Sequence, residues 1–147
     1  MRSNLNLIII DSNFLLLPFQ FKLDYFNEIR MKLEGELRFI VFKQILDELE
    51  AKRKREPQAT KFIRLLDSGL SYIENNKANN KVEFYDEIKN GNESTDEFLL
   101  RKALELKKEG NYIFLATNDS ELRKKAKRLK ISTIFLRQKK FLSIERV

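Results

Sequence analysis

Two apolar segments of this chain are each followed by a carboxylate, and these acids are its first candidates for chemistry. Asp11 directly follows the run Leu7–Ile10, and Asp119 lies shortly after the run Ile113–Ala116. Continuous apolar runs are typical of strands buried on both faces, and ligands of open α/β sheets bind at the carboxyl ends of such strands. A carboxylate in that place either caps the next helix or takes part in catalysis. For Asp11 alone the two interpretations are equally open.

A repeated helical pattern adds a third acid. One aspartate, two leucines and an alanine share the same spacing in two predicted helices, as Asp96-Leu99-Ala103-Leu106 and as Asp119-Leu122-Ala126-Leu129. Because these offsets trace one face of an α-helix, each aspartate is expected at a helix N-terminus on the buried side. A helix N-terminus also favours an anion for purely structural reasons. The pattern predicts that three carboxylates meet at one edge of the sheet.

A fourth acid is expected from the helix predicted over residues 43–55. Glu48 borders its apolar side next to Ile45, and Glu50 borders it next to Leu46. Helical geometry does not choose between the two glutamates. A solvated flank of the helix explains either one without any function.

The composition restricts the chemistry that these acids can perform. The 147 residues include no histidine and no cysteine, which excludes imidazole bases, thiolate nucleophiles, disulfides and metal sites built from those side chains. Clustered carboxylates repel one another unless a proton or a cation neutralises them. Oxygen ligands favour Mg²⁺ or Mn²⁺. We therefore expect one or two such ions that activate water for phosphodiester hydrolysis, with Thr117 and Asn118 positioning the water or a phosphate oxygen.

The chain is strongly basic, with a formal net charge of +7 and a sequence pI near 9.6. This charge favours a polyanionic partner such as RNA. The residues expected to line an RNA path are Lys52, Arg53, Lys54 and Arg55 in one helix and Arg123 and Lys124 in another. A solvated helix face is the alternative for each. No segment has the length of a membrane span and the N-terminus lacks a signal-peptide pattern, so we expect a cytoplasmic protein without a membrane partner.

Strands and helices alternate along the chain. Strands are predicted over residues 7–10, 37–42, 82–85, 112–116 and 131–136, with a short edge strand at 140–144, and helices over 21–33, 43–55, 57–73, 95–109 and 119–130. Pro57 is predicted to be a first helical residue, Gly69 a weak point of the same helix, and Ser94 with Glu97 a capping box. The alternation predicts one α/β domain over residues 1–147, with a mostly parallel sheet of about five strands and helices on both faces.

Four segments resemble, in order and spacing, the motifs of PIN domains, a family of metal-dependent nucleases. They are Ile8–Leu15, Ile45–Leu49, Thr95–Glu97 and Ala116–Asp119, and they cover nearly the whole chain. The resemblance implies an acidic metal site made of Asp11, Glu48, Asp96 and Asp119, supported by Asn13, Thr117 and Asn118. It thereby favours Glu48 over Glu50. Many relatives have an aspartate where this chain has Glu97, which is therefore either a supporting acid or only the partner of Ser94.

The resemblance implies a Mg²⁺- or Mn²⁺-dependent endoribonuclease. Stand-alone archaeal members near the rRNA-processing branch look most similar, and toxin-type ribonucleases share the motifs. Expected partners are therefore RNA, including rRNA or tRNA, a second copy of the chain, and an antitoxin or a ribosome-assembly factor. The alternative is a catalytically weak or inactive module of the same fold that binds RNA or protein.

Three other uses of such a sheet fit the sequence less well. An aspartate-nucleophile phosphatase normally has a second aspartate at the position of Asn13. A phosphoacceptor receiver domain would have paired acids at the end of the first strand. Dinucleotide binding calls for a glycine-rich turn after a strand, and this chain has only four glycines, none of them in such a turn.

Overall fold

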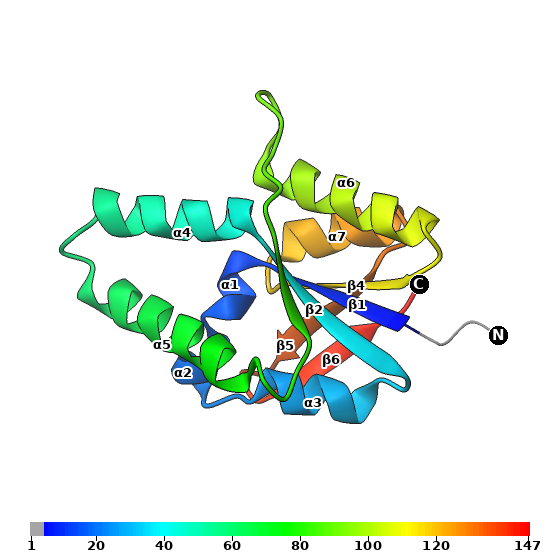
Figure 1. Cartoon of the computed structure of the whole chain (residues 1–147), viewed down its shortest axis with the longest axis horizontal. Coiled ribbons are helices and arrows are strands. Elements are labelled where there is room, and N and C mark those ends of the chain that lie inside the picture. Colours follow the sequence, from blue (N-terminus) through cyan, green and yellow to red (C-terminus); the bar gives the residue numbers. More distant parts are fainter. Residues whose placement is uncertain (1–4) are drawn as a thin grey trace.

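Six strands form one sheet in the order β3-β2-β1-β4-β5-β6 (Figure 1). The computed structural model describes residues 5–147, so the first four residues of the predicted domain lie outside it. The strands are β1 Leu5–Ile10, β2 Glu36–Phe42, β3 Val82–Tyr85, β4 Tyr112–Ala116, β5 Ser132–Arg137 and β6 Phe141–Glu145. β1 to β5 are parallel, and β6 runs antiparallel to β5. The predicted α/β class is confirmed, with the edge strand as a sixth member of the sheet.

β1 lies at the centre of the sheet because its sequence is apolar on both faces. Leu7 to Ile10 are all buried, as are Ile113 to Ala116 of the neighbouring β4. From β1 the chain adds β2 and β3 on one side of the sheet, and later adds β4 and β5 on the other side. The topology therefore reverses between β1 and β4, and such a switch point leaves a crevice at the carboxyl ends of the two strands.

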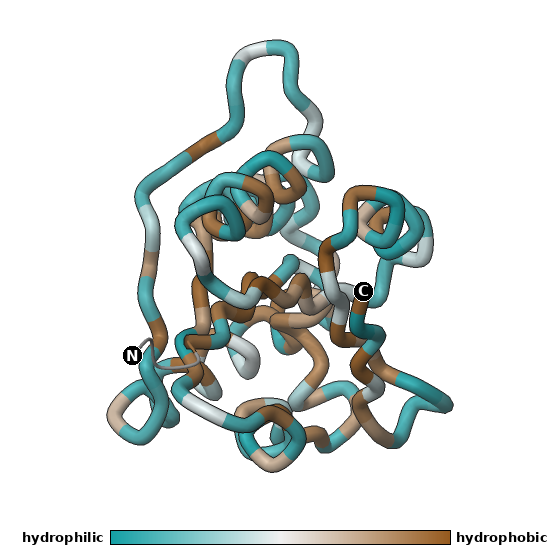
Figure 2. Tube along the Cα trace, turned by 90° about the vertical axis from the view of Figure 1, so that its right-hand side faces the viewer, coloured by the Kyte–Doolittle hydropathy of each residue, from teal (hydrophilic) through white to brown (hydrophobic). Residues whose placement is uncertain are grey.

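Seven helices lie in the described part of the chain. They are α1 Ser12–Leu15, α2 Leu17–Phe21, α3 Tyr25–Lys32, α4 Lys43–Arg55, α5 Thr60–Asn76, α6 Thr95–Lys108 and α7 Ser120–Arg128. α6 and α7 cover one face of the sheet and α3 the other, while α4 and α5 extend past the carboxyl ends of the strands (Figure 1). Hydrophobic residues concentrate along the central strands, and hydrophilic ones on the outer helical turns and loops (Figure 2). No helix described between residues 5 and 147 is long and apolar enough to cross a membrane.

The helix predicted over residues 21–33 is wrong at its beginning. α1 and α2 precede it, and Lys22 ends α2 in the left-handed conformation with φ 52°. α3 then starts after Asp24, whose side chain accepts a hydrogen bond from the backbone N–H of Asn27 at 3.3 Å. α1 and α2 were not predicted because Phe14, Leu15 and Leu17 are all buried, so this segment has no alternation of apolar and polar positions that would indicate a helix.

Two other local predictions also need correction. Pro57 lies in a turn that is closed by a hydrogen bond of 3.0 Å from the N–H of Ala59 to the carbonyl oxygen of Glu56. α5 begins only at Thr60. Proline suits the second position of such a turn as well as it suits a first helical turn. Leu129 is 41% exposed because α7 ends at Arg128, so the buried stripe of that helix stops at Ala126.

Candidate active site

Asp11 and Thr117 follow directly on the paired ends of β1 and β4. Ile10 is the register partner of Ala116, and the backbone N–H of Asp11 donates to the carbonyl of Ala116 at 3.0 Å. The sheet register therefore brings residues that are far apart in sequence to one point. This point is the crevice at which the strand order reverses.

The Asp11 carboxylate is buried and held by three donors. Its Oδ1 accepts from the backbone N–H of Ser12 at 2.8 Å, and its Oδ2 accepts from the Thr117 hydroxyl at 2.7 Å and from Asn13 Nδ2 at 3.3 Å. Burial raises the pKa of Asp11, the bonds from Thr117 and Ser12 lower it, and the negative charges of Asp96 and Asp119 raise it further. Asp96 and Asp119, the two acids predicted to lie near Asp11, therefore both affect the pKa of its carboxylate.

Polar side chains fix the two loops around Asp11. The Thr117 hydroxyl accepts from the backbone N–H of Asp119 at 3.1 Å, and Asn13 Oδ1 accepts from the N–H of Asn118 at 3.0 Å. Asn118 Oδ1 in turn accepts from the N–H of Leu136 at 2.9 Å. The side-chain oxygen of Asn118 is therefore hydrogen-bonded to β5, and this bond anchors the loop after β4. Its predicted contact with water or phosphate is left to its Nδ2 group.

Asp119 is the N-cap of α7, and its charge raises the pKa of Asp11 and of Asp96. Its Oδ1 accepts from the N–H groups of Glu121 at 2.9 Å and Leu122 at 3.2 Å. No group within residues 5–147 donates a hydrogen bond to the other oxygen, Oδ2. The structural and the catalytic interpretations of Asp119 are therefore compatible, because capping uses only one of its two carboxylate oxygens.

Asp96 lies in the first turn of α6 among the other acids. Its half-buried position raises its pKa, and the charges of Asp119 and Glu48 raise it further, while Lys125 lowers it. Lys125, in the basic run of α7, therefore opposes the repulsion that the other acids exert on Asp96.

Glu48 reaches the same region from α4 and is held by two neighbours that the sequence analysis missed. Its Oε1 accepts from Gln44 Nε2 at 3.2 Å and from the hydroxyl of Thr95, the residue before Asp96. Gln44 is buried, and its Oε1 accepts from the backbone N–H of Lys89 at 2.9 Å. Gln44 lies one turn before Glu48, which is the only sequence signal that pointed to it.

The remaining acids of these helices have other partners. Glu50 forms an ion pair with Arg53 at 3.7 Å on the exposed side of α4. Glu97 completes the predicted capping box, since Glu97 and Ser94 each accept from the other's N–H at 3.1 Å, and these bonds lower the pKa of Glu97. The carboxylate of Glu97 is exposed and is not brought to the other four acids.

The donor set suits a hard divalent cation in its chemistry. It consists of carboxylate, hydroxyl and amide oxygens. The charges of Asp96 and Asp119 raise the pKa of Asp11, and the charge of Asp119 raises the pKa of Asp96, an effect that a bound cation would reverse. Among residues 5–147, however, no three acidic side chains stand close enough to enclose an ion. Ligation would therefore require side chains such as Asp96 and Glu48 to move towards Asp11.

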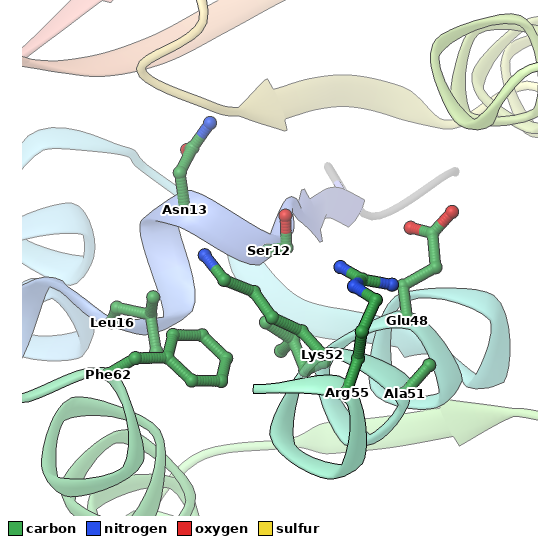
Figure 3. A pocket seen from close by; sticks show the side chains of 9 residues that line it. Ser12, Asn13, Leu16, Glu48, Ala51, Lys52, Arg55 and Phe62 are labelled. Carbon is green, nitrogen blue, oxygen red and sulfur yellow. The ribbon is translucent and has the colours of Figure 1, made fainter. Parts of the chain in front are cut away.

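The basic residues predicted to bind RNA fall into two groups. Lys52 and Arg55 line a pocket of about 470 Å³ next to Glu48 (Figure 3). Arg53 instead pairs with Asp67 of α5 at 2.6 Å, and Lys54 is exposed outside the pocket. On α7, the Arg123 guanidinium lies 4.0 Å from the centroid of the Phe135 ring, and Lys124 pairs with Glu121 at 3.6 Å.

Comparison with known proteins gives relatives for this arrangement. Ribonuclease VapC4 of Methanocaldococcus jannaschii is 29% identical over 137 residues, which are 93% of this chain and 95% of that protein. A structure of the PIN domain endonuclease Utp24 matches with a TM-score of 0.68 at 19% identity, over 96% of this chain and 92% of that one. A domain of a functionally unknown protein from Methanocaldococcus jannaschii matches with a TM-score of 0.61 at 20% identity, over 89% and 91%. The family model described as a PIN like domain matches residues 8–139, so this chain belongs to the PIN-like domain family.

Proposed function

We propose that this protein is an endoribonuclease that hydrolyses RNA phosphodiester bonds with one or two Mg²⁺ or Mn²⁺ ions. The observation that supports the proposal is that four acids from separate elements affect one another's charge near the sheet's switch point, as the pKa shifts of Asp11 and Asp96 indicate. Asp11 comes from the end of β1, Glu48 from α4, Asp96 from α6 and Asp119 from the loop after β4. The similarity to a protein named as a ribonuclease supports the same activity.

In this proposal Asp11, Asp96, Asp119 and Glu48 hold the metal. When bound, such an ion lowers the pKa of water and stabilises the oxygens of an in-line phosphodiester displacement. The hydroxyl of Thr117 lowers the pKa of Asp11 against the effect of burial, and the bonds from Thr117 and Asn13 orient the carboxylate. Glu97 serves only to cap α6, which is why its substitution should matter less than that of the four acids.

The substrate and partners follow from charge and from the relatives. A net charge of +7 favours a polyanion, as do Lys52 and Arg55 beside Glu48, which form no ion pair with any residue from 5 to 147. We propose RNA because the curated relative is named a ribonuclease. Either an rRNA-processing role or a toxin-type role is compatible with these residues. A homodimer and an antitoxin or ribosome-assembly partner stay predictions of the sequence.

A second candidate function has its own supporting observation. Because no three acids of residues 5–147 stand close enough to enclose an ion, the chain also fits a PIN-like module that binds RNA without cleaving it. In that case the carboxylates cap helices and hold loops, as Asp119 and Asp11 demonstrably do.

Cleavage of a labelled RNA by purified protein separates the two functions. We expect cleavage with added Mg²⁺ or Mn²⁺ that stops in excess chelator. Removing a partner that only orients a metal ligand typically costs about 10–100-fold, so Asp11→Asn and Glu48→Gln should each lose at least about a hundredfold. Asp47→Asn is the matched control, because Asp47 neighbours Glu48 but pairs with Lys43 on the exposed side. Equal cleavage by wild type and Asp11→Asn would refute the nuclease proposal.

A further inference from the structure

The pocket beside Glu48 has a charged side and an apolar side. It lies between α1, α4 and the beginning of α5, and the residues that matter for its chemistry are Ser12, Asn13, Leu16, Lys52, Arg55 and Phe62. Figure 3 shows the long side chains of Lys52 and Arg55 extending from α4, with Phe62 and Leu16 on the other side of Lys52. Its volume of about 470 Å³ falls within the range of roughly 300–1,000 Å³ that is usual for small-ligand sites.

The charged side carries two cations that have no acidic partner. Within residues 5–147, neither Lys52 nor Arg55 forms an ion pair, although Glu48 lines the same pocket. Arg53, between them in sequence, is engaged by Asp67 and Glu50. A cation that the fold leaves unpaired beside a carboxylate cluster is available for a phosphate group.

The apolar side presents one aromatic face. Phe62 packs against the core but also lines the pocket, and the Lys52 ammonium lies 4.5 Å from the centroid of its ring. A cation held only by a ring at a partly exposed site is bound weakly, by about 0.5–1 kcal/mol. A phosphate would therefore draw Lys52 away and leave the ring free to stack on a nucleobase.

We propose that this pocket binds one nucleotide of the RNA strand, adjacent to the bond that the acids cleave. Lys52 and Arg55 take its phosphate and the face of Phe62 stacks on its base. The inference rests on the proposed function, because it takes the acids as the cleavage site. It also accounts for the arrangement of the run Lys52–Arg55, in which two side chains serve the ligand and Arg53 joins α4 to α5.

Binding measured without cleavage tests the pocket separately from the chemistry. We would titrate the full chain into a fluorescent single-stranded RNA in excess chelator and follow anisotropy at several salt concentrations. Lys52→Gln and Arg55→Gln should each weaken binding and reduce the slope of log affinity against log salt by about 0.7. Lys108→Gln is the charge-matched control, since Lys108 is exposed at the far end of α6. An equal loss of slope in Lys108→Gln would overturn the phosphate site.

Base stacking has its own readout. Phe62→Leu keeps an apolar side chain but removes the aromatic face, and should weaken binding about fivefold or more. A series of RNAs can each carry one abasic nucleotide at a different position along the strand. One of these RNAs should bind the wild-type protein less tightly than the intact RNA does. Phe62→Leu should not weaken the binding of that RNA any further. If Phe62→Leu binds like wild type at an unchanged melting temperature, or if an acidic peptide binds more tightly than RNA, the proposal is wrong.

The two proposals fail in different ways. If the pocket variants change RNA binding as expected but no metal supports cleavage, the nuclease proposal fails and the nucleotide pocket stands on its own. If cleavage depends on Asp11 while Lys52→Gln, Arg55→Gln and Phe62→Leu bind and cleave like wild type, the pocket proposal fails and the nuclease proposal stands.

Discussion

The two carboxylate oxygens of Asp11 have separate hydrogen-bond donors. Its Oδ1 accepts the bond from Ser12 that caps α1, while its Oδ2 accepts from Thr117 across the strand boundary. The carboxylate is only 6% exposed, and its burial opposes ionisation. Capping of α1 is therefore compatible with the catalytic role that we propose for this residue, because the cap uses only Oδ1.

Acidification should stop cleavage before it unfolds the protein. Burial raises the pKa of Asp11 and of Asp96 above 3.8, so both acids take up protons at a pH above that value and could then no longer hold the proposed metal. A raised folded-state pKa means that these two groups favour folding below 3.8 and lose that contribution as the pH rises through the folded value. Glu93 behaves oppositely, because Arg101 lowers its pKa to about 2 and its contribution is lost only as the pH falls from 4.5 towards 2.

The measurement is the cleavage rate against pH beside the circular dichroism signal of the same samples. The rate should fall on acidification while the signal stays native, and more Mg²⁺ or Mn²⁺ should move the fall to lower pH because metal and proton compete. A rate that falls only together with the native signal would contradict this.

Thr117 should tune the acidity of Asp11. Thr117→Val removes the hydroxyl that donates to Asp11 Oδ2 at 2.7 Å and accepts from the N–H of Asp119. Hydrogen bonds to charged groups contribute about 1.5–3 kcal/mol, so the free energy of unfolding in urea should fall by that order. The pKa of Asp11 should rise, which moves the acid limb of cleavage to higher pH. Thr117→Ser keeps the hydroxyl and should restore both values; a Ser variant as impaired as Val would point to packing instead.

At the scale of elements, strands were easier to predict from the sequence than helices. β1 and β4 are apolar on both faces, so runs such as Leu7–Ile10 identify them directly. The parallel arrangement then places Asp11 and Thr117 at one edge, although only the register shows that they are neighbours. α1 and α2 escaped prediction because their buried sides leave no periodic pattern, and the role of Gln44 depends on contacts with Glu48 and Lys89 that no local pattern encodes.

The close approach of α5 to α1 depends on Gly69. A Cβ at this position would lie 2.5 Å from the backbone carbonyl oxygen of Leu15. Gly69→Ala should therefore lower the free energy of unfolding, measured by chemical denaturation, by about 1–3 kcal/mol. In a solvent-exposed helix the same substitution would raise it by about 1 kcal/mol. Gly91→Ala meets no atom within 4 Å and should stay within about 0.5 kcal/mol of wild type. A stabilised Gly69→Ala variant would show that α5 packs less tightly than described.

Gln44 is expected to act as a positioning residue for Glu48. Gln44→Leu keeps the approximate volume but removes the bond to Glu48 Oε1 and the acceptor for the N–H of Lys89. Cleavage should fall by about 10–100-fold, as for other partners that orient a metal ligand. The activity of Gln44→Leu should recover partly at higher metal concentration, which a purely structural defect would not do. Unchanged cleavage together with faster amide exchange at Lys89 would restrict Gln44 to anchoring the loop.

At the scale of the whole molecule, the charge is distributed in a way that composition does not reveal. The net charge of +7 predicts a polyanionic partner but not where it binds. Only the fold shows that Arg53 and Lys124 have acidic partners while Lys52 and Arg55 face the pocket beside Glu48. The acids and these two cations come from elements at the carboxyl edge of the sheet, and this is the face that we propose for RNA.

The most direct test of the account is a crystal structure of the protein soaked with Mn²⁺, measured at a wavelength at which manganese scatters anomalously. We expect anomalous density bounded by the carboxylates of Asp11, Asp96 and Asp119, with Glu48 turned towards it, and no such density in Asp11→Asn. Anomalous density elsewhere on the surface, or none at all while these carboxylates stay apart, would contradict the claim that they form one metal site.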